Sequence, residues 1–154
     1  MSTARSDRSN DEKFAQSAAA SVGAVFLLVG ILGFIPGVTS NYDTLTFASH
    51  ESEAELLGIF QVSILHNLVH VLFGIAGLAA ARQVRNVVPY LIGGGVIYLA
   101  LTVYGVLIDQ DSDANFVPVN SADNWLHLVL GTGMVALGLV VQRRLRTDTT
   151  SAKP

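Results

Sequence analysis

The sequence predicts an all-α integral membrane protein, a four-helix bundle of two parallel-duplicated helical hairpins with both termini cytoplasmic. Three observations predict this fold. The mean hydropathy is +0.49 and only 14% of the 154 residues are charged, which is too apolar for an ordinary small soluble domain. Lys and Arg are confined to three short segments. A motif of Asn, His and Gly occurs twice, in two different apolar stretches.

The positions of the basic residues predict the orientation in the cell membrane. The nine Lys and Arg residues are Arg5, Arg8, Lys13, Arg82, Arg85, Arg143, Arg144, Arg146 and Lys153. The connections near 37–63 and 109–120 contain acidic residues but no Lys or Arg. Because short loops rich in Lys and Arg stay in the cytoplasm during insertion, we expect a multi-pass protein whose termini and middle turn are cytoplasmic.

The first half of the chain is expected to contain a tail, a span and a long outer connection. Residues 1–13 are polar and predict a disordered cytoplasmic tail. Residues 14–35 predict the first span, since about 20 apolar residues cross a bilayer. Within the connection 37–63, the apolar positions of SHESEAELLGIF (residues 49–60) predict a short helix lying on the outer leaflet.

The second half is expected to supply three further spans. These are residues 64–82, 87–108 and 121–141, and only a short turn separates the first two. Residues 143–154 form a basic cytoplasmic tail. Residues 14–142 are therefore predicted to be a single four-span membrane domain.

The second and fourth spans contain an internal repeat at an offset of 57 residues. The matching pairs are Val62 and Val119, Asn67 and Asn124, His70 and His127, and Gly74 and Gly131. The shared pattern is Asn-x-x-His-x-x-x-Gly, whose spacings of three and four place all three residues on one face of a helix. Both copies run from outside to inside, so we interpret the repeat as a parallel duplication of a helical hairpin.

In an up-down bundle the second and fourth spans lie on a diagonal, so their polar faces can meet in the core. His70 and His127 would then face each other in the outer third of the membrane. Crossed hydrogen bonds would join Asn67 to His127 and Asn124 to His70. Gly74 and Gly131, one turn further in, would allow neighbouring helices to approach closely.

Two long segments carry a resemblance to a known family. GIFQVSILHNLVHVLFGIAGLAAA (58–81) and FVPVNSADNWLHLVLGTGMVALGL (116–139) resemble the bacterial family called domain of unknown function 4383. The resemblance covers most of residues 18–142 and implies four spans with paired His-containing helices, but no established activity. The family commonly has Asn where the first copy of the repeat in this chain has Ser63. The second copy has the family's Asn, as Asn120. This difference from the family pattern concerns only the residue that caps the helix.

Four interpretations of the polar face remain open. In the first, which we favour, Asn67, Asn124, Gly74 and Gly131 are structural and no cofactor is bound. In the second, His70 and His127 are the axial ligands of a haem. The other two are a divalent-metal or proton site and an enzyme with a His general base, for which no nucleophile is visible.

The metal interpretation has its own candidate ligands. His66, His70, His127 and Asp123 could bind zinc or copper, since imidazole suits both ions and His66 and His70 are four residues apart on one helix. The absence of cysteine excludes disulfides, thiol catalysis and Cys-ligated metal sites.

The expected function is that of a scaffold, accessory subunit or sensor in the membrane, with an outward-side Asn/His site. The alternative is a bis-His haem or divalent-metal-binding membrane protein. The expected partners are the lipid bilayer and either other membrane proteins or further copies of this chain. The basic inner rim suits anionic lipid head groups and gives no reason to expect nucleic-acid binding.

Overall fold

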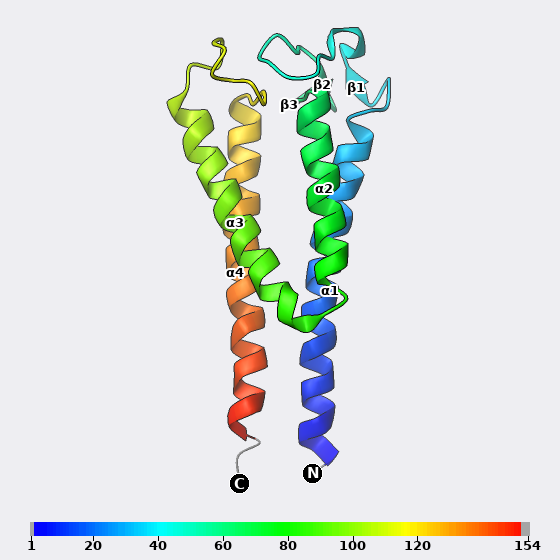
Figure 1. The fold of residues 1–154 in the computed structure, drawn as a ribbon, viewed down its shortest axis with the longest axis vertical. Helices are drawn as coiled ribbons and strands as arrows, with labels where there is room; N and C mark the ends of the chain where they lie inside the picture. Colours follow the sequence, from blue (N-terminus) through cyan, green and yellow to red (C-terminus); the bar gives the residue numbers. More distant parts are fainter. Residues whose placement is uncertain (1, 152–154) are drawn as a thin grey trace.

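The computed structural model describes the backbone of residues 2–151 and the side chains of residues 6–147. The described chain is mostly helical, with helices α1 (Ser2–Leu32), α2 (Ile64–Ala80), α3 (Val84–Leu107) and α4 (Ser121–Ser151). In Figure 1, α1 lies beside α2 and α3 lies beside α4. The start of α1 and the end of α4 lie at one end of the molecule, and the two long connections lie at the other. The predicted helical architecture is therefore confirmed.

Three helical segments within the described residues are long and apolar enough to cross a membrane. They are Ser6–Leu32, Val84–Leu107 and Ser121–Thr147. Helix α2 is also apolar but has only 17 residues. By length and composition, the chain is therefore a candidate membrane protein with three clear spans and one shorter apolar helix.

Both terminal segments are helical where the sequence predicted tails. α1 begins at Ser2, although residues 1–13 were expected to be disordered, and α4 continues to Ser151, well into the expected tail 143–154. The physical reason is that extending an existing helix by one residue is far easier than starting a new one. Lys153, part of the predicted basic tail, lies outside the described residues.

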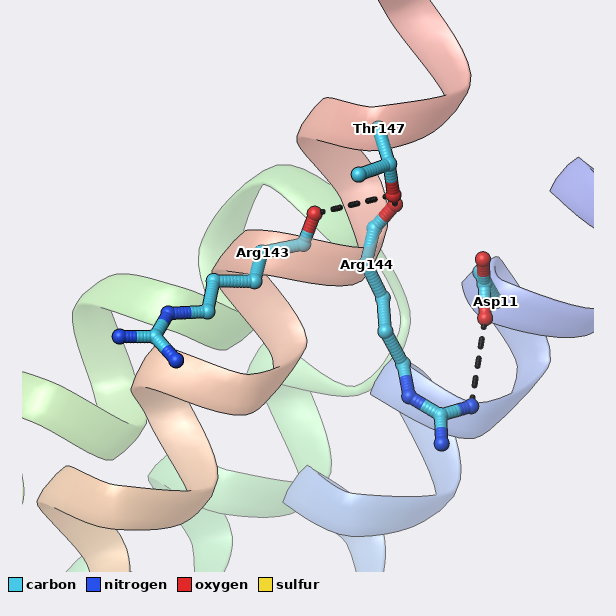
Figure 2. Close-up of polar contacts among 4 residues, drawn as sticks. All are labelled: Asp11, Arg143, Arg144 and Thr147. Atoms are coloured by element: carbon cyan, nitrogen blue, oxygen red, sulfur yellow. Dashed lines mark hydrogen bonds and ion pairs between the residues drawn. The ribbon is translucent and has the colours of Figure 1, made fainter.

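Polar contacts join α1 and α4 beyond their apolar parts (Figure 2). Arg144 Nη1 lies 3.4 Å from Asp11 Oδ1, and the Arg144 guanidinium lies 4.4 Å from the centroid of the Phe14 ring. Thr147 Oγ1 donates hydrogen bonds to the carbonyl oxygens of Arg143 and Arg144. Exposed ion pairs of this kind stabilise a fold by no more than about 1 kcal/mol each, so they align the two helices rather than hold them together.

The first outer connection forms a small antiparallel sheet instead of the predicted interfacial helix. Its strands are β1 (Thr39–Ser40), β2 (Glu55–Leu56) and β3 (Phe60–Gln61), in that order, and a short 3₁₀ helix, η1 (Tyr42–Thr44), follows β1. The physical reason is the turn between β2 and β3, where Leu57 and Gly58 have φ of 57° and 69°. These values reverse the chain and are incompatible with a right-handed helix.

Glycines of the predicted motif bring the helices of each pair into close contact. A Cβ at Gly74 of α2 would lie 2.5 Å from the backbone nitrogen of Leu27 in α1, and a Cβ at Gly131 of α4 would lie 2.9 Å from the carbonyl oxygen of Gly95 in α3. Between the two pairs, Phe26, Tyr98 and Met134 form a buried core cluster. This packing fixes how α2 and α4 are rotated, and hence where their polar side chains point.

Candidate metal centre

Three buried histidines from two helices meet between α2 and α4. His66 and His70 are one turn apart on α2, and His127 is on α4. One ring nitrogen of each lies within 4.8 Å of those of the other two, and the residues are 4%, 6% and 3% exposed. The structure thus brings together three of the four histidines of the chain, and these are three of the four metal ligands proposed from the sequence.

The His66 ring is oriented by a hydrogen bond from outside its own helix. Its Nδ1 lies 3.0 Å from the carbonyl oxygen of Pro118, in the connection that precedes α4. Because a carbonyl oxygen can only accept, Nδ1 must carry the proton, and in the neutral ring Nε2 then keeps its lone pair. At the start of α2, Ser63 Oγ accepts a hydrogen bond from the His66 backbone N–H at 3.1 Å and caps the helix.

The other two histidines lack hydrogen-bonding partners on their rings. His127 Nδ1 is buried with no partner, and the His70 ring forms no hydrogen bond with any residue that the structure describes. Aromatic neighbours hold the rings instead: Phe26 lies edge-on to His70 at 5.7 Å, and Tyr98 lies edge-on to His127 at 5.1 Å between ring centroids. Buried polar atoms without partners are uncommon in folded proteins, so His127 Nδ1 calls for an explanation.

The crossed hydrogen bonds predicted between Asn and His are wrong. Asn67 Nδ2, Asn124 Oδ1 and His127 Nδ1 are all buried without a hydrogen bond. Each Asn instead packs against a glycine of its own hairpin: a Cβ on Gly33, which directly follows α1, would overlap the Asn67 amide, and a Cβ on Gly105 of α3 would overlap the Asn124 amide. The physical reason is the helical period. The Asn and the His of each motif are three residues apart, so their side chains point in directions that differ by about 60°, and only the histidines face the other hairpin.

Asp123, the fourth proposed metal ligand, lies outside the histidine cluster. Its Oδ2 accepts hydrogen bonds from the backbone N–H of Asn120 at 2.9 Å and of Gln61 at 3.0 Å. Asn120 Oδ1 in turn accepts from the Asp123 backbone N–H at 3.0 Å, which completes a reciprocal cap at the start of α4. The bond from Gln61 ties β3 to α4. Through its two hydrogen bonds, the Asp123 carboxylate links the connection before α2 to the connection before α4.

A cavity of about 540 Å³ lies directly beside the histidines. Its polar residues are His66, His70, His127, Tyr98 and Tyr104, and the other residues that line it are apolar. The sequence placed both tyrosines in a span but did not connect them with the site. The available signal was the six-residue spacing of the two tyrosines within a mostly apolar helix.

The comparisons with known proteins give one finding. Residues 16–140 match the family described as Domain of unknown function (DUF4383). No curated protein and no solved structure matches the chain.

Proposed function

This chain belongs to that family, and we propose that it is a small multi-pass membrane protein that binds one divalent transition-metal ion at His66, His70 and His127. The observation that carries the proposal is the convergence of three buried ring nitrogens within 4.8 Å. Two nitrogens bound to one zinc ion at ~2.0–2.1 Å each lie at most about 4.2 Å apart. Small side-chain movements are therefore enough to close the site around an ion.

The surroundings of the histidines support a metal site. Histidines that bind metals usually donate their second ring N–H to a carboxylate or carbonyl oxygen, as His66 donates to Pro118. His127 Nδ1 is buried without a hydrogen-bonding partner, and an ion held by the three rings would account for such a polar atom in this site. A site made only of imidazole suits Zn²⁺, Cu²⁺ or Ni²⁺, and three protein ligands leave a fourth position open.

The same geometry disfavours haem, the redox alternative. A bis-His haem needs two nitrogens on opposite faces of a porphyrin, and the ring fills the plane between them. With three nitrogens mutually within 4.8 Å, the third imidazole would lie inside the area that the porphyrin occupies. A single small ion has no such conflict.

A purely structural role is also less well supported than metal binding. That interpretation relied on hydrogen bonds between Asn67 and His127 and between Asn124 and His70, which do not form. The two asparagines pack within their own hairpins, so the histidines hold no partner helix by hydrogen bonding to them. An ion would link α2 to α4 directly.

We place the site in the outward half of a four-span bundle with both termini cytoplasmic. The 17 residues of α2 are at the short end of what can cross a bilayer, and α2 lies along α1. If α2 crosses, every Lys and Arg lies on one side, as insertion favours. A site on the outward side suits an accessory subunit or sensor that responds to an ion outside the cytoplasm.

A parallel duplication of hairpins explains the pseudo-symmetric environment of the site. Ser63 and Asn120, 57 residues apart, cap α2 and α4. Asn67 and Asn124, at the same offset, each pack on a glycine at or near the end of the preceding helix. His66 has no counterpart, since Asp123 occupies the equivalent position. The third ligand is therefore specific to the first copy.

Zinc titration into the metal-free full-length protein in detergent tests the proposal. We expect one ion per chain, and at least tenfold weaker binding when His66, His70 or His127 is replaced by alanine. His50→Ala is the matched control, because His50 lies in the outer connection away from the cluster. Binding should be weaker at pH 5.5 than at pH 7.5, since protons compete with the ion for imidazole. Equal zinc binding by His127→Ala and His50→Ala would refute the site.

A further inference from the structure

The cavity beside the histidines is shaped to hold a molecule larger than a water. At about 540 Å³ it falls within the range of sites for small organic ligands, which is ~300–1,000 Å³. It is lined by residues of α2, α3 and α4 and by Phe116, Val117 and Val119 of the second outer connection. All three histidines of the cluster are on its wall, so the open position of a bound ion can face into it.

The walls of the cavity are apolar and carry no charge of their own. Val69, Ile97 and Leu101 are among its residues, and the described residues that line it include no Asp, Glu, Lys or Arg. A divalent ion held by three neutral imidazoles would therefore keep its full charge. In an apolar, buried setting that charge favours an anionic fourth ligand, because an unpaired buried charge is very costly.

The ring of Tyr98 lies beside two of the histidines on the wall of the cavity. Its ring centroid is 5.1 Å from that of His127 and 6.4 Å from that of His70. Its hydroxyl forms no hydrogen bond with any residue in the described part of the chain, whereas the Tyr104 hydroxyl donates to the carbonyl oxygen of Ala114. The Tyr98 hydroxyl is thus available to donate to an oxygen of a bound ligand.

Some of the residues that line the cavity are also exposed on the surface of the protein. Ile97 on α3 and Phe116 line the cavity and are 49% and 56% exposed. Ile97 lies within a candidate membrane span, so in the proposed topology its exposed side would border the acyl chains of the bilayer. An apolar molecule dissolved in the membrane can enter from the side without crossing water.

From these observations, and resting on the proposed metal site, we infer that the cavity binds a long-chain carboxylate. The apolar chain occupies the cavity between α2 and α3. One carboxylate oxygen takes the open position of the ion, and the Tyr98 hydroxyl donates to the other. Because the bilayer is as apolar as the cavity, the head group, rather than the chain, supplies most of the selectivity.

The test uses the full-length protein loaded with Co²⁺, whose visible absorption reports its fourth ligand. We expect dodecanoate to shift the Co²⁺ bands and methyl dodecanoate, which has the same chain without the anionic group, to leave them unchanged. In Tyr98→Phe, half of the spectral change should require about tenfold more dodecanoate, as loss of one hydrogen bond to a charged group predicts. Equal responses to the acid and the ester would overturn the inference.

A second pair of variants tests whether the cavity holds the chain. Ala100 lines the cavity, so Ala100→Phe should raise the dodecanoate concentration needed for half of the change at least tenfold, while acetate, which needs only the open position, acts as before. Ala76→Phe is the control, because Ala76 is exposed on α2 outside the cavity. An unchanged dodecanoate response in Ala100→Phe overturns the inference.

The two proposals fail in different ways. If Co²⁺ gives no bands that depend on the three histidines, the metal site itself is wrong. If Co²⁺ binds at one ion per chain but dodecanoate changes nothing, only the carboxylate site is wrong. Unchanged Co²⁺ stoichiometry in Ala100→Phe and Tyr98→Phe shows that these variants keep the fold around the histidines.

Discussion

At the scale of single residues, neighbouring polar side chains on one helix have different tasks. His66 and His70 point from α2 toward α4, while Asn67, between them, packs against Gly33, which directly follows α1. Polar groups within a membrane are costly unless they face the protein interior, and all three are buried. His66 and Asn67 are adjacent in the chain but point in different directions around the helix. One therefore belongs to the candidate site and the other to the packing within the first hairpin.

Asp123→Ala should destabilise the protein and leave metal binding intact. The side chain is 2% exposed and accepts hydrogen bonds from two backbone N–H groups. Losing them should lower the free energy of unfolding by about 2–3 kcal/mol. Thermal unfolding in detergent measures this, with Asp111→Ala as the control, since Asp111 is exposed. Zinc should still bind at one ion per chain, and loss of zinc from a folded Asp123→Ala protein would make Asp123 a ligand.

At the scale of elements, each hairpin is held by close helix contact and by a cap at its outer end. The helices of a pair approach so closely that glycines meet backbone atoms of the neighbouring helix. Without a hydrophobic driving force between helices in lipid, such van der Waals contacts through small residues are a main source of association. The sheet β1–β2–β3 closes the outer end of the first hairpin, and Ala54, Leu56 and Val62 are buried beneath it.

Gly105→Ala and Gly133→Ala should have opposite effects on stability. Both glycines are inside helices, but a Cβ at Gly105 would overlap the Asn124 side chain, whereas a Cβ at Gly133 would meet nothing within 4 Å. We expect Gly105→Ala to lower the free energy of unfolding by about 1–3 kcal/mol. Gly133→Ala should be neutral or stabilising by up to about 1 kcal/mol, because alanine favours a helix. Comparable unfolding temperatures for the two variants would argue against the close contact between α3 and α4 at Gly105.

At the scale of the whole molecule, the two ends of the bundle differ in charge. The end formed by the two outer connections carries acidic residues and no Lys or Arg. The opposite half includes Arg82 in the α2–α3 turn, Arg85 in the first turn of α3, and the arginines of α4. The acidic end attracts cations, which would raise the local concentration of an ion near the proposed metal site.

The absence of cysteine makes the topology directly testable. Single cysteines are introduced as Asp111→Cys in the second outer connection and Gln83→Cys in the α2–α3 turn, both at exposed positions. A membrane-impermeant maleimide should label the first in intact cells and the second only after the membrane is permeabilised. The cysteine-free parent is the background control. The reverse pattern would invert the proposed orientation, and labelling of both in intact cells would mean that α2 and α3 do not separate two compartments.

The sequence by itself determined the features that depend on near neighbours in the chain. The apolar stretches predicted the helices, and the spacing of His66 and His70 placed two candidate ligands on one face, because the period of a helix is fixed by its backbone. Only the tertiary structure decided which distant groups meet. It brought His127 to the pair, left Asp123 as a cap, turned Asn67 and Asn124 toward glycines, and folded the outer connection into a sheet. These outcomes depend on how each helix is rotated against its neighbour, which packing across the bundle sets and helical periodicity does not.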